Sequence, residues 1–363
     1  MALDYHKFGS EISDRSPQFI GAVLERLYVD RPELEERYGA AGRERCREDI
    51  AFHFCTLSES IAAQELGIWL KYIGWGKIVL GSRGVRLDDL IDALLIMQEV
   101  ITENVKGKAA AVACEYIQTA VNKFDSFPRS VPSYIDSRAP LQKLANAYLQ
   151  ALLSVDRNDA RKLIRGAIAA GTRVSEIFRY VFEPVQREVG RLWQMNQISV
   201  AQEHYCTATT EMLIGEISRD RDEIDRGPHF FLGTCVAGAH HTVGIRMLSE
   251  LMESNGWKVY FTGANTPSSN LVELTSRFNI DVLGISAATC MELAVCRKLI
   301  ASVKLKNKKK TRIMVGGRIF NEFPNLWSKV GADSWSQDAV SAVNVARELL
   351  PKAALKRARA NGR

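Results

Sequence analysis

The second half of the chain alternates short apolar runs with longer amphipathic segments. Runs at 230–236, 258–262, 282–287 and 313–315 are rich in apolar and β-branched residues, which is typical of buried strands. Residues 245–252 place apolar side chains at helical spacing between the first two runs. Strands that alternate with helices predict right-handed βαβ crossovers. The pattern therefore predicts a C-terminal α/β domain with a doubly wound parallel sheet over residues 228–350.

The first 225 residues show the period of helices instead. Residues 1–125 predict an all-helical domain, and the segment 126–140, with three prolines and several serines, predicts a linker. Residues 141–225 are again helical, and Ser199 with Gln202 three residues later predicts a capping box at a helix start. The helices expected in the first domain lie at 16–28, 42–64, 66–80, 86–103 and 107–123, with breaks near Gly39, Gly67 and Gly84.

The composition predicts a cytoplasmic protein with reduced thiols. Among 363 residues there is no signal peptide and no apolar run of transmembrane length, so we expect no membrane association. Seven cysteines without a Cys-x-x-Cys pair argue for free thiols and against a zinc site. The net charge of +6 depends on the basic tail 351–363, which carries five basic residues. Together with lysines 308–310, these cations predict a solvated surface, and no DNA-binding motif is present.

Three points along the predicted sheet carry candidate chemistry. They are His241-x-x-Gly244, then Ser286, then Gly316-Gly317. Each follows or ends a predicted strand, and ligands of such sheets bind outside the carboxyl ends of the strands. A neutral imidazole is a good donor to transition metals, and glycines let the backbone approach a bulky ligand closely.

This spacing resembles the cobalamin-binding, flavodoxin-like domain of methionine synthase, base-off mutases and light-responsive cobalamin repressors. Here 41 residues separate Gly244 from Ser286, and 29 separate Ser286 from the glycine pair, as in that family. The resemblance implies that His241 is the lower axial ligand of cobalt, and that Ser286 and the glycines hold the nucleotide tail of cobalamin. His240 lacks this offset to Gly244. The family's aspartate two residues before the histidine is replaced here by Ala239.

A second signature lies just upstream, where nine residues separate Trp193 from Glu203-His204. It resembles the helical cap of cobalamin photoreceptors and implies a four-helix-bundle cap over 141–225. The resemblance implies that Trp193, Glu203 and His204 contact the cofactor on its upper side, with adenosylcobalamin as the expected form. Gln194 stands where light-sensing repressors have a second histidine ligand to cobalt. The alternative is that Trp193 belongs to the core and Glu203-His204 to an ordinary helix surface.

A third resemblance concerns the N-terminal region. The segment 43–80 is similar to the globin-like sensor half of photocobilins, photoreceptors that hold cobalamin and the linear tetrapyrrole biliverdin side by side. It implies a globin-like sensor domain over 1–125 with biliverdin as a second chromophore.

Five residues of this segment suit a tetrapyrrole. Asp49 and His53 are four residues apart and share a helix face, where they could contact pyrrole N–H groups and propionates. Tyr72 lies three residues from both Trp69 and Trp75, which gives an aromatic face for a flat ligand. The alternative is that the histidine and the aromatic stripe belong to the core of the helical domain.

Together these features predict a cobalamin-dependent light sensor. Photolysis of adenosylcobalamin would change the packing of the cap, and thereby the oligomeric state or the binding of a signalling partner. We expect a homo-oligomer, a dimer or tetramer, that has no catalytic residues and is not an enzyme. The first alternative is a corrinoid methyl carrier for a separate methyltransferase. The second is a haem or redox sensor on the same scaffold, with His241 or His53 bound to iron.

Overall fold

The computed structural model describes residues 4–219, 226–307 and 310–350. Lys308, Lys309 and the basic tail 351–363, predicted to be solvated, lie outside the described residues. Within the described ranges no helix is long and apolar enough to cross a membrane.

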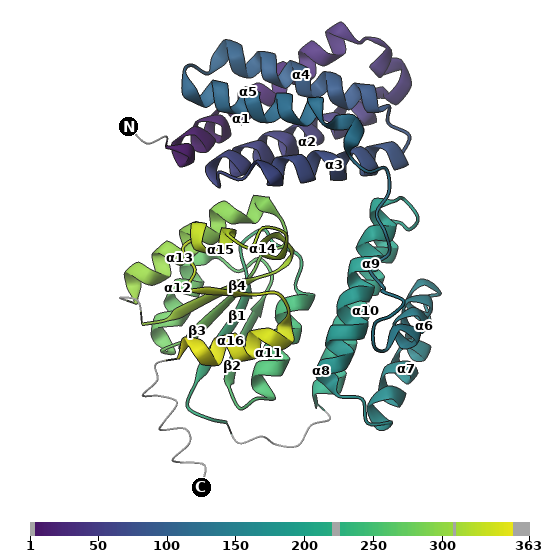
Figure 1. The fold of residues 1–363 in the computed structure, drawn as a ribbon, viewed down its shortest axis with the longest axis vertical. Coiled ribbons are helices and arrows are strands. Elements are labelled where there is room, and N and C mark those ends of the chain that lie inside the picture. Colours follow the sequence, from purple (N-terminus) through teal and green to yellow (C-terminus); the bar gives the residue numbers. More distant parts are fainter. Residues whose placement is uncertain (1–3, 220–225, 308–309, 351–363) are drawn as a thin grey trace. The chain divides into compact units, whose positions relative to one another are not determined.

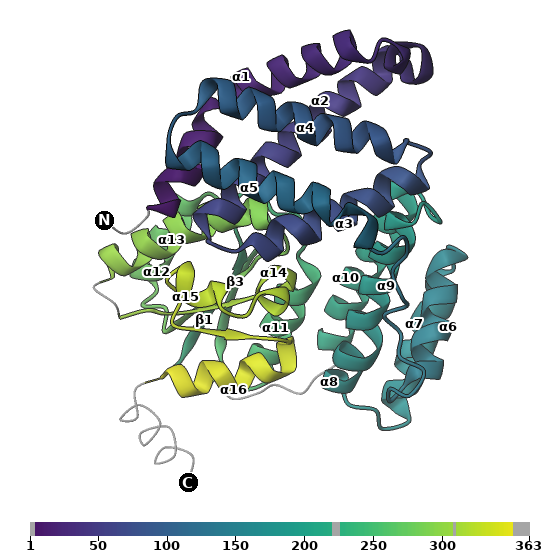
Figure 2. The ribbon, with the colours of Figure 1, turned by 45° about the horizontal axis from the view of Figure 1, so that its top comes forward.

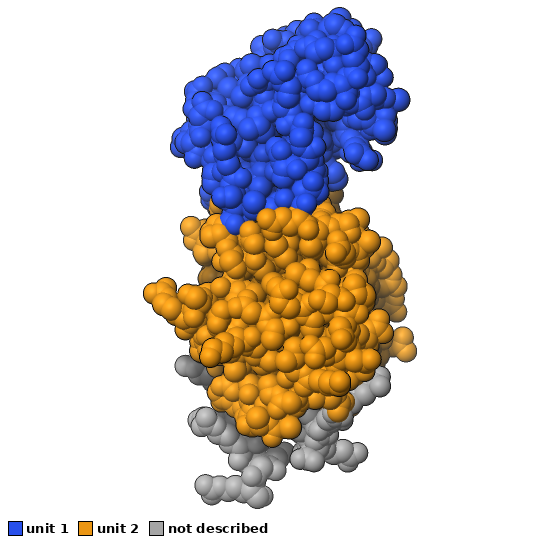
Figure 3. All heavy atoms as spheres, turned by 90° about the vertical axis from the view of Figure 1, so that its right-hand side faces the viewer, with its two compact units in different colours: residues 1–131, 194–196 blue, residues 132–193, 197–363 orange. Residues whose placement is uncertain are grey.

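Two compact units make up the chain (Figure 3). The first joins residues 1–131 to 194–196, and the second joins 132–193 to 197–363. The division between residues 131 and 132 lies inside the segment 126–140, which the sequence predicts as a linker. The other predicted domain boundaries stay predictions.

The first unit is all helical. Its first helix begins at Tyr5 and not at residue 16 as predicted, because the Asp4 carboxylate accepts a hydrogen bond from the backbone N–H of Lys7 at 3.1 Å and caps the helix start. Gly39, at φ +62°, kinks one long helix where the sequence predicts a break. The helices of this unit are α1 (Tyr5–Asp30), α2 (Glu33–Ala62), α3 (Leu66–Ser82), α4 (Leu87–Asn104), α5 (Lys108–Asn122) and the 3₁₀ turn η1 (Phe124–Ser126).

These helices pack around one apolar core. Helix α1 contacts α2, α4 and α5, and α3 contacts α2 and α5 (Figure 1, Figure 2). Burial of each large apolar side chain stabilises the fold by roughly 1.5–3 kcal/mol. The five helices each contribute to this core, for example through Phe19, Phe54, Trp69, Met97 and Ile117.

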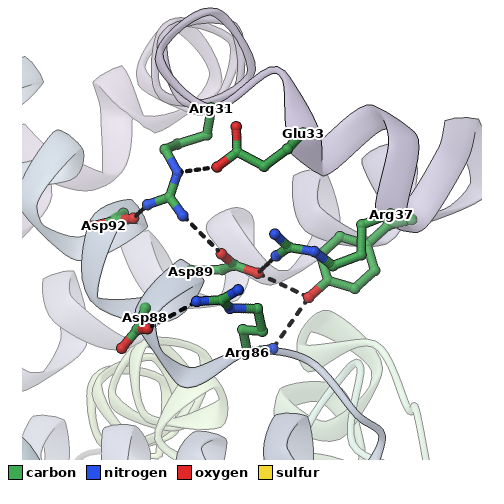
Figure 4. Close-up of polar contacts among 8 residues, drawn as sticks. Arg31, Glu33, Arg37, Arg86, Asp88, Asp89 and Asp92 are labelled. Carbon is green, nitrogen blue, oxygen red and sulfur yellow. Dashed lines mark hydrogen bonds and ion pairs between the residues drawn. The ribbon is translucent and has the colours of Figure 1, made fainter.

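The carboxylate of Asp89, near the start of α4, gathers charged side chains from three helices (Figure 4). Asp89 is only 7% exposed, and it accepts hydrogen bonds from Arg37 Nη1 and from the Tyr38 hydroxyl, both at 2.8 Å. The guanidinium of Arg31 lies 3.6 Å away and also pairs with Asp92. The two arginines, at the end of α1 and in α2, are therefore held against α4 by one buried anion.

The second unit begins with helices. Its helical elements are α6 (Gln142–Leu153), α7 (Arg157–Ala169), α8 (Val174–Ile177), the π-helical turn η2 (Phe178–Phe182), α9 (Glu183–Gln194) and α10 (Val200–Arg219). The apolar positions over 174–194 have helical spacing, but the π-helical turn η2 interrupts a regular helix there. The π turn places the rings of Phe178 and Phe182 in one core at a centroid distance of 5.9 Å. The capping box is confirmed, because the N–H of Ser199 donates to Gln202 Oε1 at 2.9 Å and the N–H of Gln202 donates to Ser199 Oγ at 3.3 Å.

A five-stranded parallel sheet with the order β2-β1-β3-β4-β5 completes the second unit. Its strands are β1 (Phe230–Cys235), β2 (Lys258–Gly263), β3 (Val282–Ser286), β4 (Arg312–Gly316) and β5 (Ser334–Ser336). The predicted class, a helical N-terminal region followed by a doubly wound parallel sheet, is confirmed. The sequence does not predict β5, because Ser-Trp-Ser is not an apolar run. In the structure β5 pairs with β4, with Ser334 opposite Met314.

Helices cover both faces of the sheet (Figure 1). Helices α11 (Val243–Glu253) and α16 (Ala339–Leu349) contact each other on one face, and α12 (Ser268–Arg277) and α13 (Leu293–Lys306) contact each other on the other. The central strands β1 and β3 are accordingly buried along almost their whole length. The short elements η3 (Cys290–Glu292), α14 (Arg318–Glu322) and α15 (Leu326–Lys329) complete the connections.

We expect Asp89→Asn to lower the free energy of unfolding by about 2 kcal/mol, because the substitution leaves Arg31 and Arg37 beside a neutral buried group. Asp88→Asn is the matched control. Its side chain is 70% exposed and its contact with Arg86, at 3.4 Å, lies at the surface, so the change should stay within about 0.5 kcal/mol. Denaturant unfolding followed by circular dichroism measures both, and equal stabilities would contradict the role given to Asp89.

Candidate functional site

The carboxyl ends of β1, β3 and β4 lie side by side at one edge of the sheet. In the parallel register Cys235 is opposite Ser286, and Ser286 is opposite Gly316. The strand order reverses between β1 and β3, which is the point where open sheets of this kind bind ligands. His241 lies in the loop that follows β1. The fold therefore brings His241, Ser286 and the glycine pair, which are far apart in sequence, to the same edge.

The loop between β1 and α11 presents His241 to solvent. Its backbone is held at two points, since the Cys235 thiol donates to the carbonyl oxygen of His241 at 3.4 Å and the N–H of Gly238 donates to Asn265 Oδ1 at 3.0 Å. Gly238 adopts φ +82°, a conformation that favours glycine. The loop is thus anchored through its backbone, while the imidazole is exposed.

Desolvation keeps the His241 imidazole neutral, although nearby carboxylates oppose the effect. Desolvation by the surrounding loops is the largest effect and lowers the pKa of His241 below its ordinary value of 6.5. The charge of Glu292 opposes this shift, Arg318 adds to it, and Glu203 opposes it. The net pKa is lowered, so at pH 7 the ring is uncharged and a nitrogen lone pair is available to a metal.

Glu292 is a functional candidate that the sequence analysis did not identify. It is 7% exposed, ends η3 directly after β3, and accepts hydrogen bonds from the N–H of Ala288 at 2.7 Å and from the Thr289 hydroxyl at 3.2 Å. Ala239, at the position of the family aspartate, is buried and offers no charge. Glu292 is therefore a fixed negative charge that acts on His241 from the neighbouring loop. No local pattern distinguishes it from other glutamates.

Ser286 and Gly316 take part in contacts within the sheet edge. The Ser286 side chain forms a hydrogen bond with the thiol of Cys235, whose pKa burial raises to about 12. The N–H of Ala287 donates to the carbonyl oxygen of Gly316 at 2.9 Å. A Cβ on Gly316 would lie 3.3 Å from the carbonyl oxygen of Ser336, which leaves little room for a side chain.

The other two glycines differ in what surrounds them. A Cβ on Gly317, at φ +101°, would come within 2.2 Å of the carbonyl oxygen of Ala287, so protein packing alone requires glycine there. A Cβ on Gly244 would meet no protein atom within 4 Å. Contacts with other protein atoms therefore do not explain why residue 244 is a glycine. The space beside Gly244, at the start of α11 and three residues after His241, is open.

The donor set fits cobalamin. The described residues hold no group of three or more His, Cys, Asp or Glu that could bind a metal ion by itself. A corrin ring supplies four nitrogen ligands, so its cobalt needs only one from the protein. A neutral, exposed imidazole beside open space meets that need.

The cap signature lies on α9 and α10. Glu203 Oε2 is 2.5 Å from His204 Nδ1, and the Thr207 hydroxyl donates to Glu203 Oε1 at 3.0 Å. The side chain of Glu203 is 28% exposed, whereas that of His204 is 74% exposed. Trp193, at the end of α9, is half-buried. Because Glu203 acts electrostatically on His241, the cap signature and the loop after β1 share one neighbourhood of the second unit.

Gln194 belongs to the first unit. Its carbonyl oxygen accepts hydrogen bonds from the Ser82 hydroxyl at 3.1 Å and from Arg83 Nη1 at 3.2 Å. Gln194 is 8% exposed, so the residue in place of a second histidine ligand is buried.

The aromatic residues predicted in the first unit come together with His53. His53 Nδ1 lies 2.8 Å from the Tyr72 hydroxyl. The Tyr72 ring stacks between Trp69 and Trp75, at centroid distances of 5.9 Å and 6.0 Å. Trp69 is fully buried, as the core alternative expects, whereas Tyr72 and Trp75 are half-buried.

Burial changes the charge state of the two polar candidates on α2. Desolvation lowers the pKa of His53 to about 4, so its ring is neutral at pH 7. Desolvation, followed by the charge of Glu48, raises the pKa of Asp49 to about 6. Both groups therefore hold less charge near neutral pH than exposed side chains would.

Two family models match the second unit, and both describe a B12 binding domain. One matches residues 231–344, which comprise the parallel sheet and its helices. The other matches residues 144–217, which comprise most of the helical part from α6 to α10.

The sequence relatives of this chain are corrinoid proteins. Dimethylamine corrinoid protein 3 of Methanosarcina mazei is 32% identical over 117 residues, which are 32% of this chain and 68% of that protein. This chain belongs to the corrinoid proteins. The chain is also 33% identical over 117 residues to dimethylamine corrinoid protein 1 of Methanosarcina mazei. It spans about half the length of that relative, 53%. The match to dimethylamine corrinoid protein 3 of Methanosarcina acetivorans extends over 218 residues at 25% identity and covers 58% of this chain and 99% of that one.

A solved structure of the Methanosarcina barkeri monomethylamine corrinoid protein is also similar. It has a TM-score of 0.48 and 20% sequence identity, and the match covers 58% of this chain and 100% of that one.

These relationships decide two of the predictions. The prediction of a cobalamin-binding protein is confirmed by the two B12 binding domain models and by the corrinoid relatives. The prediction that the chain is not an enzyme is wrong, because its relatives are dimethylamine corrinoid proteins.

We expect His241→Ala to weaken retention of hydroxocobalamin about tenfold or more, because the substitution removes the imidazole ligand to cobalt. His240→Ala is the matched control, since this neighbour is equally exposed but has a different offset to Gly244. Equilibrium dialysis gives the affinity, and the absorption spectrum reports the axial ligand. Loss of the cofactor in His240→Ala with an unchanged spectrum in His241→Ala would place the ligand one residue earlier.

Proposed function

We propose that this corrinoid protein is a methyl carrier that holds cobalamin at the carboxyl edge of its sheet and serves a separate methyltransferase. The observation that carries the proposal is the neutral, exposed imidazole of His241 beside the open space at Gly244, in a sheet that matches a B12 binding domain. The names of the relatives, dimethylamine corrinoid proteins, support a methylated amine as the source of the methyl group.

When bound, cobalamin supplies a cobalt centre that accepts and donates a methyl group. The residues of the chain perform the surrounding tasks. His241 would hold cobalt as a neutral donor, and the charge of Glu292 would stabilise positive charge on this imidazole. Ser286 and the glycine pair line the sheet edge, where the nucleotide tail of the cofactor would lie. Trp193 and Glu203 shape the upper side.

Light sensing with adenosylcobalamin is a second candidate. One observation favours it, namely the nine-residue spacing of Trp193 and Glu203 together with the effect of the Glu203 charge on the pKa of His241. A group the size of adenosyl would contact side chains such as Trp193 and Glu203 on the upper side, whereas a methyl group is too small to need them. In this function the homo-oligomer or a signalling partner would receive the change.

The two candidates differ in their preferred upper ligand. A methyl carrier is expected to bind methylcobalamin at least as tightly as adenosylcobalamin and to keep its molecular mass under green light. A light sensor is expected to prefer adenosylcobalamin and to change its molecular mass on illumination. Equilibrium dialysis in the dark, followed by light scattering before and after illumination of the full chain, separates them.

Trp193→Ala tests the upper wall. We expect the ratio of adenosylcobalamin to methylcobalamin affinity to fall about fivefold in this variant, because removal of a half-buried indole takes contact area from the adenosyl group and leaves the smaller methyl group unaffected. Val200→Ala, at an exposed position in the first turn of α10, is the control and should leave the ratio unchanged. An unchanged ratio in both variants would make Trp193 a packing residue of the cap.

We also propose that the first unit binds a linear tetrapyrrole, with biliverdin as the probe. The stacked Trp69, Tyr72 and Trp75 rings and the His53–Tyr72 contact support a flat, conjugated ligand. Asp49, whose pKa is about 6, can accept hydrogen bonds from pyrrole N–H groups when it is ionised.

Biliverdin added to the full chain should produce a red or far-red absorption band. Asp49→Asn or His53→Ala should shift or abolish this band, because each removes a polar contact to the chromophore. Glu44→Gln, an exposed change on the same helix, should not. If the wild-type chain binds cobalamin but takes up no biliverdin, the helical unit has another task, such as dimerisation or partner docking.

A further inference from the structure

The hydroxyl of Thr242, the residue after His241, is turned away from its own helix. Thr242 is the N-cap of α11, where threonine commonly accepts a hydrogen bond from an N–H of the first turn. No such bond is present at this cap. Instead the Thr242 hydroxyl donates to the carboxylate of Glu211 in α10. One side-chain contact therefore ties the cap helix α10 to the start of α11, beside the candidate cobalt ligand.

The surroundings of Glu211 favour this arrangement. Helices α10 and α11 contact each other, and the N-terminal end of a helix carries a partial positive charge that stabilises a nearby carboxylate. Glu211 also lies close enough to Cys235 for its charge to raise the pKa of that thiol. Cys235 in turn donates to the carbonyl oxygen of His241. Glu211 therefore acts on two residues that adjoin His241, Thr242 next to it in the chain and Cys235 at its carbonyl oxygen.

We propose that Glu211 is a positioning residue that holds the His241 loop through Thr242 and so couples helix α10 to the lower axial ligand of the cofactor. The part of this inference that concerns the cofactor rests on the proposed cobalamin site. Glu203, of the cap signature, lies on the same helix eight residues before Glu211, about 12 Å along its axis. One helix therefore carries both the residue assigned to the upper side of the cofactor and the residue that holds the lower ligand.

The consequence is mechanical. When the group on the upper side changes and α10 shifts, Glu211 moves Thr242 and with it the backbone of His241. The length of the bond between the imidazole and cobalt then depends on the position of the cap. The coupling applies to a methyl carrier, which must admit a methyltransferase, and equally to a sensor whose upper ligand is lost.

The first measurement needs no cofactor. In the full chain, amide hydrogen exchange of residues 236–243 should become about fivefold faster in Glu211→Ala and in Thr242→Val, the factor expected for loss of one hydrogen bond. Glu216→Ala is the matched control, because it removes another carboxylate of α10 whose partner is Arg161, at 2.7 Å. Thr242→Ser keeps the hydroxyl and should exchange like the wild type, which guards against a variant that simply fails to fold.

The second measurement uses the chain loaded with cobalamin and reduced to cobalt(II). With the histidines of the protein labelled with the heavy nitrogen isotope, nitrogen hyperfine splitting in its electron paramagnetic resonance spectrum reports the bound imidazole and is distinct from the splitting that the cofactor's own dimethylbenzimidazole gives. The fraction of protein with this splitting should fall in Glu211→Ala and Thr242→Val, and cobalamin affinity should fall about tenfold. The double variant should be no worse than either single variant, since both break the same contact.

The outcomes separate this inference from the function on which it rests. If loop exchange and nitrogen splitting respond in both variants but not in Glu216→Ala, the positioning role is supported. If the wild type shows the splitting and the variants keep it unchanged, the role of Glu211 is overturned while the cobalamin site stands. If the wild type itself shows no nitrogen splitting, the assignment of His241 fails, and with it the coupling to the cofactor.

Discussion

The parallel pairing of β1 with β3 in the middle of the sheet governs the geometry of this protein. Both strands are buried between two helical layers, so their register cannot slip without moving apolar side chains out of the core. The strand order reverses at this pair, and their loops consequently diverge at one edge. His241 and Glu292 follow these two strands, which is why a histidine and a carboxylate from distant segments act on each other.

Three carboxylates lie near this edge of the sheet, and each accepts a hydrogen bond from a different donor. Glu292 is held by the backbone N–H of Ala288, and Glu203 by the Thr207 hydroxyl. Glu211 accepts from Thr242 at the positive end of α11. Desolvation nevertheless keeps the His241 imidazole neutral, which a metal ligand requires. The edge thus combines a neutral imidazole with negative groups whose charge acts on it.

Three buried polar side chains of the first unit have partners on other segments of that unit. Lys77 is 3% exposed, and its ammonium donates to the carbonyl oxygens of Phe124 and Phe127 at 2.7 Å and 2.9 Å, which fixes the chain beyond α5. Asp89 has its two arginines, and His53 has Tyr72. Because a buried polar group without a partner is costly, these contacts favour one arrangement of the five helices.

The amino-acid sequence alone determined the elements and the candidate ligand, because both are encoded in local patterns. Strand and helix periods follow from which side chains must be buried, and the Ser199–Gln202 box is a contact within four residues. The spacing from His241 to Gly244 and Ser286 indicated the cofactor class, which the B12 binding domain models confirm. Tertiary structure alone decided the π turn at Phe178–Phe182, strand β5, the placement of Glu292 near His241 and the contact between Glu211 and Thr242. These features depend on partners far away in the chain, and neither periodicity nor short-range spacing predicts which distant residue will be the partner.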